Sequence, residues 1–173
     1  MTTWTKDEVL EEAGTIRDSV RQTFDKHGGL SQMAWLFATR NPETGEDAKG
    51  LVLVPSTGRQ GYPDLIRHAG EQSRAVGVVF AVELWAIDPE YQAQIGYEAS
   101  LKEAREWAGK IAKHPHRIEC VHVSVEHHRL MNHMTWTARI ARDAEGKPSL
   151  GEWDEQTWEG SEGRFTHLLP PVN

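Results

Sequence analysis

The sequence has little cysteine, no long apolar run and no excess of positive charge. Cys120 is the single cysteine among 173 residues, which excludes an intramolecular disulfide and a zinc site built on several thiolates. No apolar segment approaches the roughly 18 residues that a membrane-spanning helix needs. The first residues, Met1 to Asp7, lack the apolar core of a signal peptide, so we expect a cytoplasmic protein without a membrane partner.

The formal net charge of −7 argues against general nucleic-acid binding, because such binding depends on Lys and Arg side chains that neutralise phosphates. A small molecule or a protein partner remains compatible with this charge. The length fits one domain over residues 1–173 with a sizeable core, and the chain shows neither an internal repeat nor a linker.

One stretch, Gly77 to Ile87, predicts the central strand of a sheet. It is nearly uninterrupted apolar sequence, rich in β-branched and aromatic residues, and Asp88-Pro89 follows it. Glu83 breaks the pattern. A carboxylate in such a strand needs a partner or a wet cavity, because burying it alone costs several kcal/mol or more.

Three segments predict helices, near residues 6–27, 63–75 and 98–112. The first has a capping box at Thr5 and Glu8 and one apolar stripe that ends before Gly28. The second begins near Pro63 and ends before Gly77. The third has an apolar stripe at helical spacing: Tyr97, Leu101, Ala104, Ala108 and Ile111.

The remaining strands complete an α+β fold. Segments 33–39 and 51–54 predict a hairpin, residues 150–158 predict an acidic edge strand, and residues 164–169 could pair once more. We expect a single-domain α+β fold with a mixed, mainly antiparallel sheet of five or six strands and two or three helices packed on one face. The loop 55–61 contains glycine, hydroxyls and an arginine but lacks the lysine of a P-loop.

Residues 117–142 contain two segments that alternate apolar and polar side chains, which is typical of paired antiparallel strands with one face on the core. With a tight connecting loop, Ser124 lies opposite His133, and His122 lies opposite Thr135. The hairpin then presents one polar set of side chains: His122, Ser124, Glu126, His133, Thr135, Thr137 and Arg139.

Each strand carries a histidine, an apolar residue, a hydroxyl residue and another apolar residue: His122-Val123-Ser124-Val125 and His133-Met134-Thr135-Trp136. This pair resembles the two motifs of the two-histidine phosphoesterase superfamily. The resemblance implies a metal-independent reaction in which one imidazole removes a proton from the attacking group and the other protonates the leaving oxygen, while the hydroxyls hold the phosphate. An ordinary or covered polar sheet surface is the alternative.

Glu83 adds a second set of candidates if its strand continues this polar face. Glu83, Trp85, Glu126 and Arg139 would then line a pocket with an aromatic wall. In the structural alternative, Glu83 forms an ion pair with Arg117 or Arg139. The sequence does not specify a metal site, either at the histidines of the hairpin or at His114-Pro115-His116, which we interpret as a polar connector.

We therefore expect a non-catalytic protein that binds a small molecule or a protein on the polar face of its sheet, without a cofactor or metal. The predicted ligand-binding residues are Glu83, Trp85, Ser124, Glu126, Thr135 and Arg139. The face could also form a homodimer. The alternative function is a two-histidine phosphodiesterase acting on a nucleotide or cyclic nucleotide, with His122 and His133 as the catalytic residues.

Overall fold

The structure, a computed structural model, describes residues 3–38, 43–44, 46, 49–53, 62–128, 132–159 and 168–169, and only the backbone of residues 50–53, 62, 132–133 and 158–159. Its elements follow in this order: α1 (Lys6–His27), β1 (Met33–Phe37), β2 (Lys49–Leu53), α2 (Tyr62–Ser73), β3 (Gly77–Ile87), α3 (Pro89–Ile95), α4 (Tyr97–Glu106), the short 3₁₀ helix η1 (Ile111–Lys113), β4 (Arg117–His127), β5 (Asn132–Arg142), β6 (Pro148–Leu150) and β7 (Asp154–Glu159).

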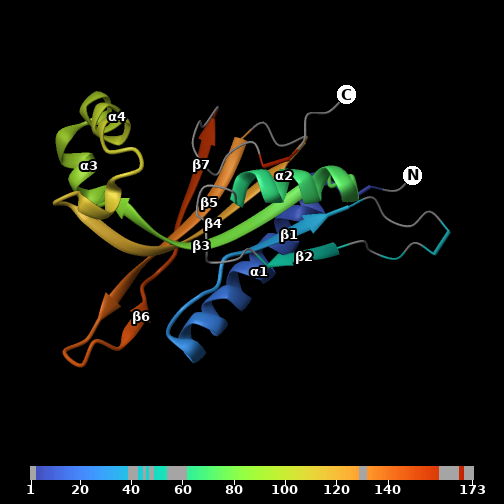
Figure 1. Cartoon of the computed structure of the whole chain (residues 1–173), viewed down its shortest axis with the longest axis horizontal. Helices are drawn as coiled ribbons and strands as arrows, with labels where there is room; N and C mark the ends of the chain where they lie inside the picture. Colours follow the sequence, from blue (N-terminus) through green and yellow to red (C-terminus); the bar gives the residue numbers. More distant parts are fainter. Residues whose placement is uncertain are drawn as a thin grey trace.

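The strands form one curled sheet in the order β2-β1-β3-β4-β5-β6 (Figure 1). β6 pairs with the end of β5, from Ile140 to Arg142, and β7 pairs with its beginning, from Asn132 to Thr137. Every pairing between described strands is antiparallel. The α+β fold and the mainly antiparallel sheet predicted from the sequence are confirmed. The predicted edge strand 150–158 is divided between β6 and β7, which share β5 as their partner.

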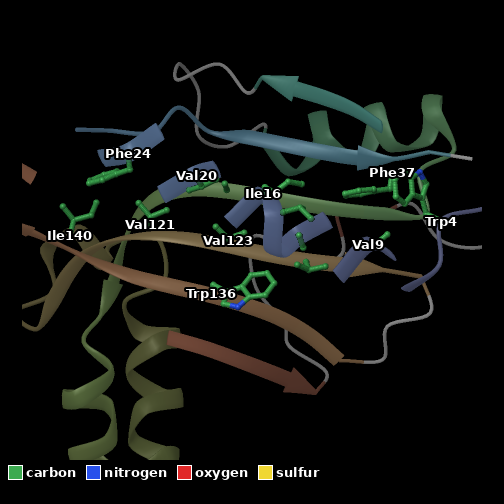
Figure 2. Packing of buried hydrophobic residues seen from close by; sticks show 14 residues of the cluster. Trp4, Val9, Ile16, Val20, Phe24, Phe37, Val121, Val123, Trp136 and Ile140 are labelled. Carbon is green, nitrogen blue, oxygen red and sulfur yellow. The ribbon is translucent and has the colours of Figure 1, made fainter. Parts of the chain in front are cut away.

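Helix α1 covers one face of the sheet, which we call the α1 face. The predicted capping box is present, because Thr5 accepts a hydrogen bond from the amide of Glu8 and the Glu8 carboxylate accepts one from the amide of Thr5. Gly28 ends the helix in the left-handed conformation, with φ of 69°. The helix buries an apolar stripe against alternate residues of β3, β4 and β5 (Figure 2): Val9, Ala13, Ile16, Val20 and Phe24.

Helix α2 lies on the opposite face of the sheet, which we call the α2 face. Its buried Ile66 packs with Phe80 and Val82 of β3, whereas Val79 and Ala81 of the same strand face α1. The expectation that the helices share one face is therefore wrong. Successive residues of a strand point to opposite faces, so a strand that is apolar throughout needs a cover on both.

The third predicted helix does not cover the sheet. Residues 89–106 form two short helices, α3 and α4, which pack on each other beyond one end of the sheet, away from α1 and α2 (Figure 1). Neither helix has a fully buried residue. The sequence signal for α3 is Asp88 followed by Pro89, since Asp88 caps the helix at the amide of Glu90 and proline suits its first position.

Some expectations fall outside the described residues. The loop 55–61 and residues 164–167 lie there, and the described pair Leu168 and Leu169 is not part of a strand. Among the helices that the structure does describe, none is both long and apolar enough to cross a membrane.

Candidate functional site

The first half of β3 is buried and the second half is largely not. Residues Gly77 to Val82 are buried, whereas Glu83, Leu84 and Ala86 are half-buried and Trp85 is exposed. By the alternation of the strand, Glu83 and Trp85 lie on the α1 face, beyond the end of α1. Three charged residues from β4 and β5 share this part of the face. Together they form the charged cluster: Glu83, Trp85, Arg117, Glu119 and Arg142.

Glu83 lies beside the chain segment that leaves α1. Its Oε1 accepts a hydrogen bond from the backbone amide of Leu30. Burial is the main reason that its pKa is raised above the ordinary 4.5, and the nearby Glu119 carboxylate raises it further, while the Leu30 amide and Arg142 act in the opposite direction. The expected ion pair of Glu83 with Arg117 or Arg139 is absent among the described residues, and the Leu30 amide takes that place.

Trp85 is a large aromatic side chain that the fold leaves 37% exposed. The guanidinium carbon of Arg117 lies over its ring, 5.2 Å from the ring centroid, which is a cation–π distance. Arg117 also donates a hydrogen bond of 3.3 Å from Nη1 to the carbonyl oxygen of His114. Arg117 therefore contacts both the indole and the His114 connector.

Glu119 and Arg142 form the best-connected ion pair of the charged cluster. Arg142 donates from Nη2 to Oε1 of Glu119 at 2.8 Å and from Nε to Oε2 at 3.1 Å. This two-point pairing fixes the planes of both groups. It also leaves Glu83 as the acid of the cluster without an arginine hydrogen-bonded to it in the described part of the chain.

The polar face of the β4–β5 hairpin is the α2 face. In the observed register, Ser124 lies opposite Thr135 and His122 lies opposite Thr137. The predicted register was therefore wrong by two residues along one strand, which keeps every side chain on its predicted face. Glu83 and Trp85 lie on the other face of the sheet, so they do not join this polar set. The pocket hypothesis required them to join it.

Ser124 and Thr135 are buried, with exposures of 3% and 6%. Glu126, beside them on β4, accepts hydrogen bonds from the backbone amides of Leu168 at 2.9 Å and Leu169 at 3.1 Å. Both leucines are buried in the α2-face core. These three predicted ligand-binding residues thus lie in a covered part of the sheet.

The rest of the polar face is more open. The Nδ1 of His122 and the Oγ1 of Thr137 share a hydrogen bond of 2.9 Å. Arg139 pairs with Asp88, with 2.8 Å between Nη2 and Oδ2. Position 133 lies in β5, four residues from Thr137, and its side chain is outside the described part of the structure.

The His114-Pro115-His116 connector is less polar than its sequence indicates. His114 is 1% exposed. Its Nδ1 accepts a hydrogen bond of 3.0 Å from the amide of His116, and its Nε2 lies 3.3 Å from Oε2 of Glu103. His116 stacks on Tyr91, with ring centroids 3.9 Å apart. The connector therefore joins α3 and α4 to the start of β4.

The described residues offer little support for a metal site or for a reactive cysteine. No group of three or more His, Cys, Asp or Glu side chains there could hold a metal ion. Burial raises the pKa of the Cys120 thiol to about 12, so the thiol stays protonated at neutral pH and is a poor nucleophile.

Sequence reasoning identified Glu83 and Trp85 but missed Glu119 and Arg142. A signal was present in β4, where the face that carries Val121, Val123 and Val125 begins with charged residues at 117 and 119. On this face the apolar residues from Val121 onward pack with α1, and the charged residues before them lie beyond its end. No protein-family model, curated protein or solved structure matches this chain.

Proposed function

We propose that this protein is a non-catalytic binding protein that recognises a positively charged group at the charged cluster. The exposed Trp85, held under Arg117 and next to a half-buried carboxylate, is the observation that carries the proposal. Tryptophan and arginine are among the residues that are enriched in binding hot spots. A tryptophan that already packs against another side chain loses less side-chain freedom when a ligand covers it.

Glu83 supports a cationic ligand. Its Oε1 binds the Leu30 amide, and no described hydrogen bond reaches its Oε2. Its raised pKa means that the ionised form is poorly stabilised in the free protein. A guanidinium or ammonium group at Oε2 would stabilise the ionised form of Glu83 through a charge-assisted hydrogen bond. The net charge of −7 would also favour the approach of a cation.

The ligand can be a small amine or guanidine, or an arginine or lysine side chain of a protein partner. Each of them carries a positively charged group that donates hydrogen bonds. The test is an NMR titration that follows the indole N–H signal of Trp85, assigned with Trp85→Phe. Agmatine represents the small molecule, and a capped Gly-Arg-Gly peptide represents the protein. The same peptide with citrulline in place of arginine removes only the charge.

We expect the Trp85 signal to move with agmatine or the arginine peptide and to stay in place with the citrulline peptide. The probe that binds more tightly identifies the source of the cation. Glu83→Gln should weaken binding by about tenfold or more, because one hydrogen bond to a charged group is worth about 1.5–3 kcal/mol. Glu71→Gln, which removes an exposed carboxylate of α2 on the opposite face of the sheet, should leave binding unchanged. A stationary indole signal, or an equal response to citrulline, would contradict the proposal.

The geometry favours the two-histidine phosphodiesterase less. His122 lies opposite Thr137, so position 133 is four residues along β5, or about 13 Å at the backbone. Ser124 and Thr135, the hydroxyls that would hold the phosphate, are buried. We expect no turnover of linear or cyclic nucleotide phosphodiesters in EDTA. Activity that survives EDTA and disappears in both His122→Ala and His133→Ala would favour the enzyme instead.

A further inference from the structure

Helix α4 carries an apolar stripe that no described part of the chain covers. Tyr97 is 75% exposed and Leu101, one turn later, is 39% exposed. Ala104 continues the stripe on α4 and is exposed as well, and the exposed Ala108 follows in the turn just after the helix ends. These are the residues whose helical spacing predicted contact with the sheet, yet α4 stands beyond the sheet with α3 as its neighbour (Figure 1). The stripe is therefore an apolar surface in need of a partner.

The two flanks of the stripe differ. One flank carries Ser100, Glu103 and Trp107, which are half-buried. Glu103 accepts a hydrogen bond of 2.9 Å from the hydroxyl of Tyr91 in α3, and the Trp107 ring contacts that of His114. This flank is already in use inside the molecule.

The other flank faces solvent and carries both signs of charge. Glu98 and Arg105 are exposed and lie seven residues apart, two turns along the same side of α4. Lys102 lies further from the stripe and pairs with Glu106 at 3.9 Å. The residues next to the stripe thus place a negative charge near the start of the helix and a positive charge near its end.

We infer that the α4 stripe is a self-association surface, on which α4 of a second copy packs antiparallel about a two-fold axis. In a two-fold antiparallel pair of helices, the same flank of each copy faces its equivalent. Glu98 of each copy then meets Arg105 of the other, which gives two ion pairs around a core of Tyr97 and Leu101. The small Ala104 allows the helices to approach closely.

The alternative orientations fit less well. A parallel pair brings the charged flank against the opposite flank of the partner, where α3 and the His114 connector already lie. The contact is also small, since a helix of ten residues is about 15 Å long. A contact well below the usual interface of about 1,600 Å² makes a weak dimer, with a Kd in the micromolar range or above.

Sedimentation velocity of the full chain over a wide concentration range tests this inference. We expect a monomer at low concentration and a dimer at high concentration. Leu101→Glu should abolish the dimer. Glu98→Arg and Arg105→Glu should each weaken it severalfold, because each places like charges opposite one another. The double variant Glu98→Arg with Arg105→Glu should restore it, because the pairs are then reversed but complete.

Glu71→Arg, an exposed charge reversal on α2, controls for the change in net charge, and circular dichroism verifies folding. Restoration by the double variant cannot come from misfolding, so it separates a specific contact from general damage. A wild-type protein that stays monomeric at the highest concentration would overturn the inference. A dimer insensitive to Leu101→Glu, or a double variant as weak as the single ones, would overturn it too.

Discussion

The two halves of β3 have the same backbone pairing with β4 and very different surroundings. From Gly77 to Ala81 the strand also pairs with β1, and helices cover both of its faces. From Glu83 to Ile87 it pairs with β4 alone among the described strands, and its side chains are mostly half-exposed. The first half of the strand therefore belongs to the packed core, and the second half carries the half-buried Glu83 and the exposed Trp85.

The boundary between the halves follows from the end of α1. Phe24 is the last residue of α1 that is buried against the sheet, and Gly28 then turns the chain away. The Leu30 amide meets Glu83 at this boundary, so the carboxylate satisfies a backbone donor where the helix cover stops. The polar residue that interrupts the apolar strand thus marks the edge of the core.

The largest effect should come from the packed half. Phe80→Ala removes a ring that is 0% exposed, and we expect it to lower the free energy of unfolding by about 3–5 kcal/mol. Tyr97→Ala is the matched aromatic deletion at a site that is 75% exposed, and its effect should stay within about 0.5 kcal/mol. Urea denaturation at low protein concentration measures both, and similar losses would mean that Phe80 is not the core residue its burial indicates.

The second-largest loss of stability should come from Glu126, which binds a segment that covers the packed half. Glu126 lies opposite Val78 and binds the amides of Leu168 and Leu169, so it holds these leucines on the α2 face. Glu126→Ala leaves both amides without their acceptor and should cost about 2–3 kcal/mol. Glu126→Gln keeps one acceptor oxygen and should cost less. A Glu126→Ala variant as stable as wild type would show that the two hydrogen bonds do not stabilise the folded protein.

Local signals predicted the elements well. The capping box at Thr5 and Gly28 gave both ends of α1, and the apolar run gave the bounds of β3, because caps and uninterrupted runs act within a few residues. The side of the sheet on which each residue of the hairpin lies was also predicted, since alternation survives a shift of two residues.

Relations between distant elements were not predictable in the same way. The apolar stripe of α4 matches that of a core helix, and only the position of the helix beyond the sheet shows that it is exposed. Glu83 found a backbone amide rather than an arginine, because the amide arrives from a segment 53 residues away in the sequence. A spacing rule shows that a residue needs a partner, but not which partner the fold supplies.

The smallest effect should come from the open half, as a dependence on pH. The pKa of Glu83 is raised in the folded protein, so the folded state binds this proton more tightly than the unfolded state. Stability from this group is present below the ordinary pKa of 4.5 and is lost as the pH rises through the raised value. The glutamine in Glu83→Gln can still accept from the Leu30 amide but does not ionise.

The free energy of unfolding of the wild type should therefore fall relative to that of Glu83→Gln as the pH rises through this window, and then level off. Urea denaturation of the two proteins at a series of pH values from acid to neutral measures the difference, and Glu71→Gln gives the effect of removing an exposed carboxylate far from Glu83. Binding of the arginine peptide should strengthen over the same window, because the ligand needs ionised Glu83. A constant difference in stability would mean that burial does not disfavour the charge of Glu83, and the open half would then lack the uncompensated carboxylate on which cation binding depends.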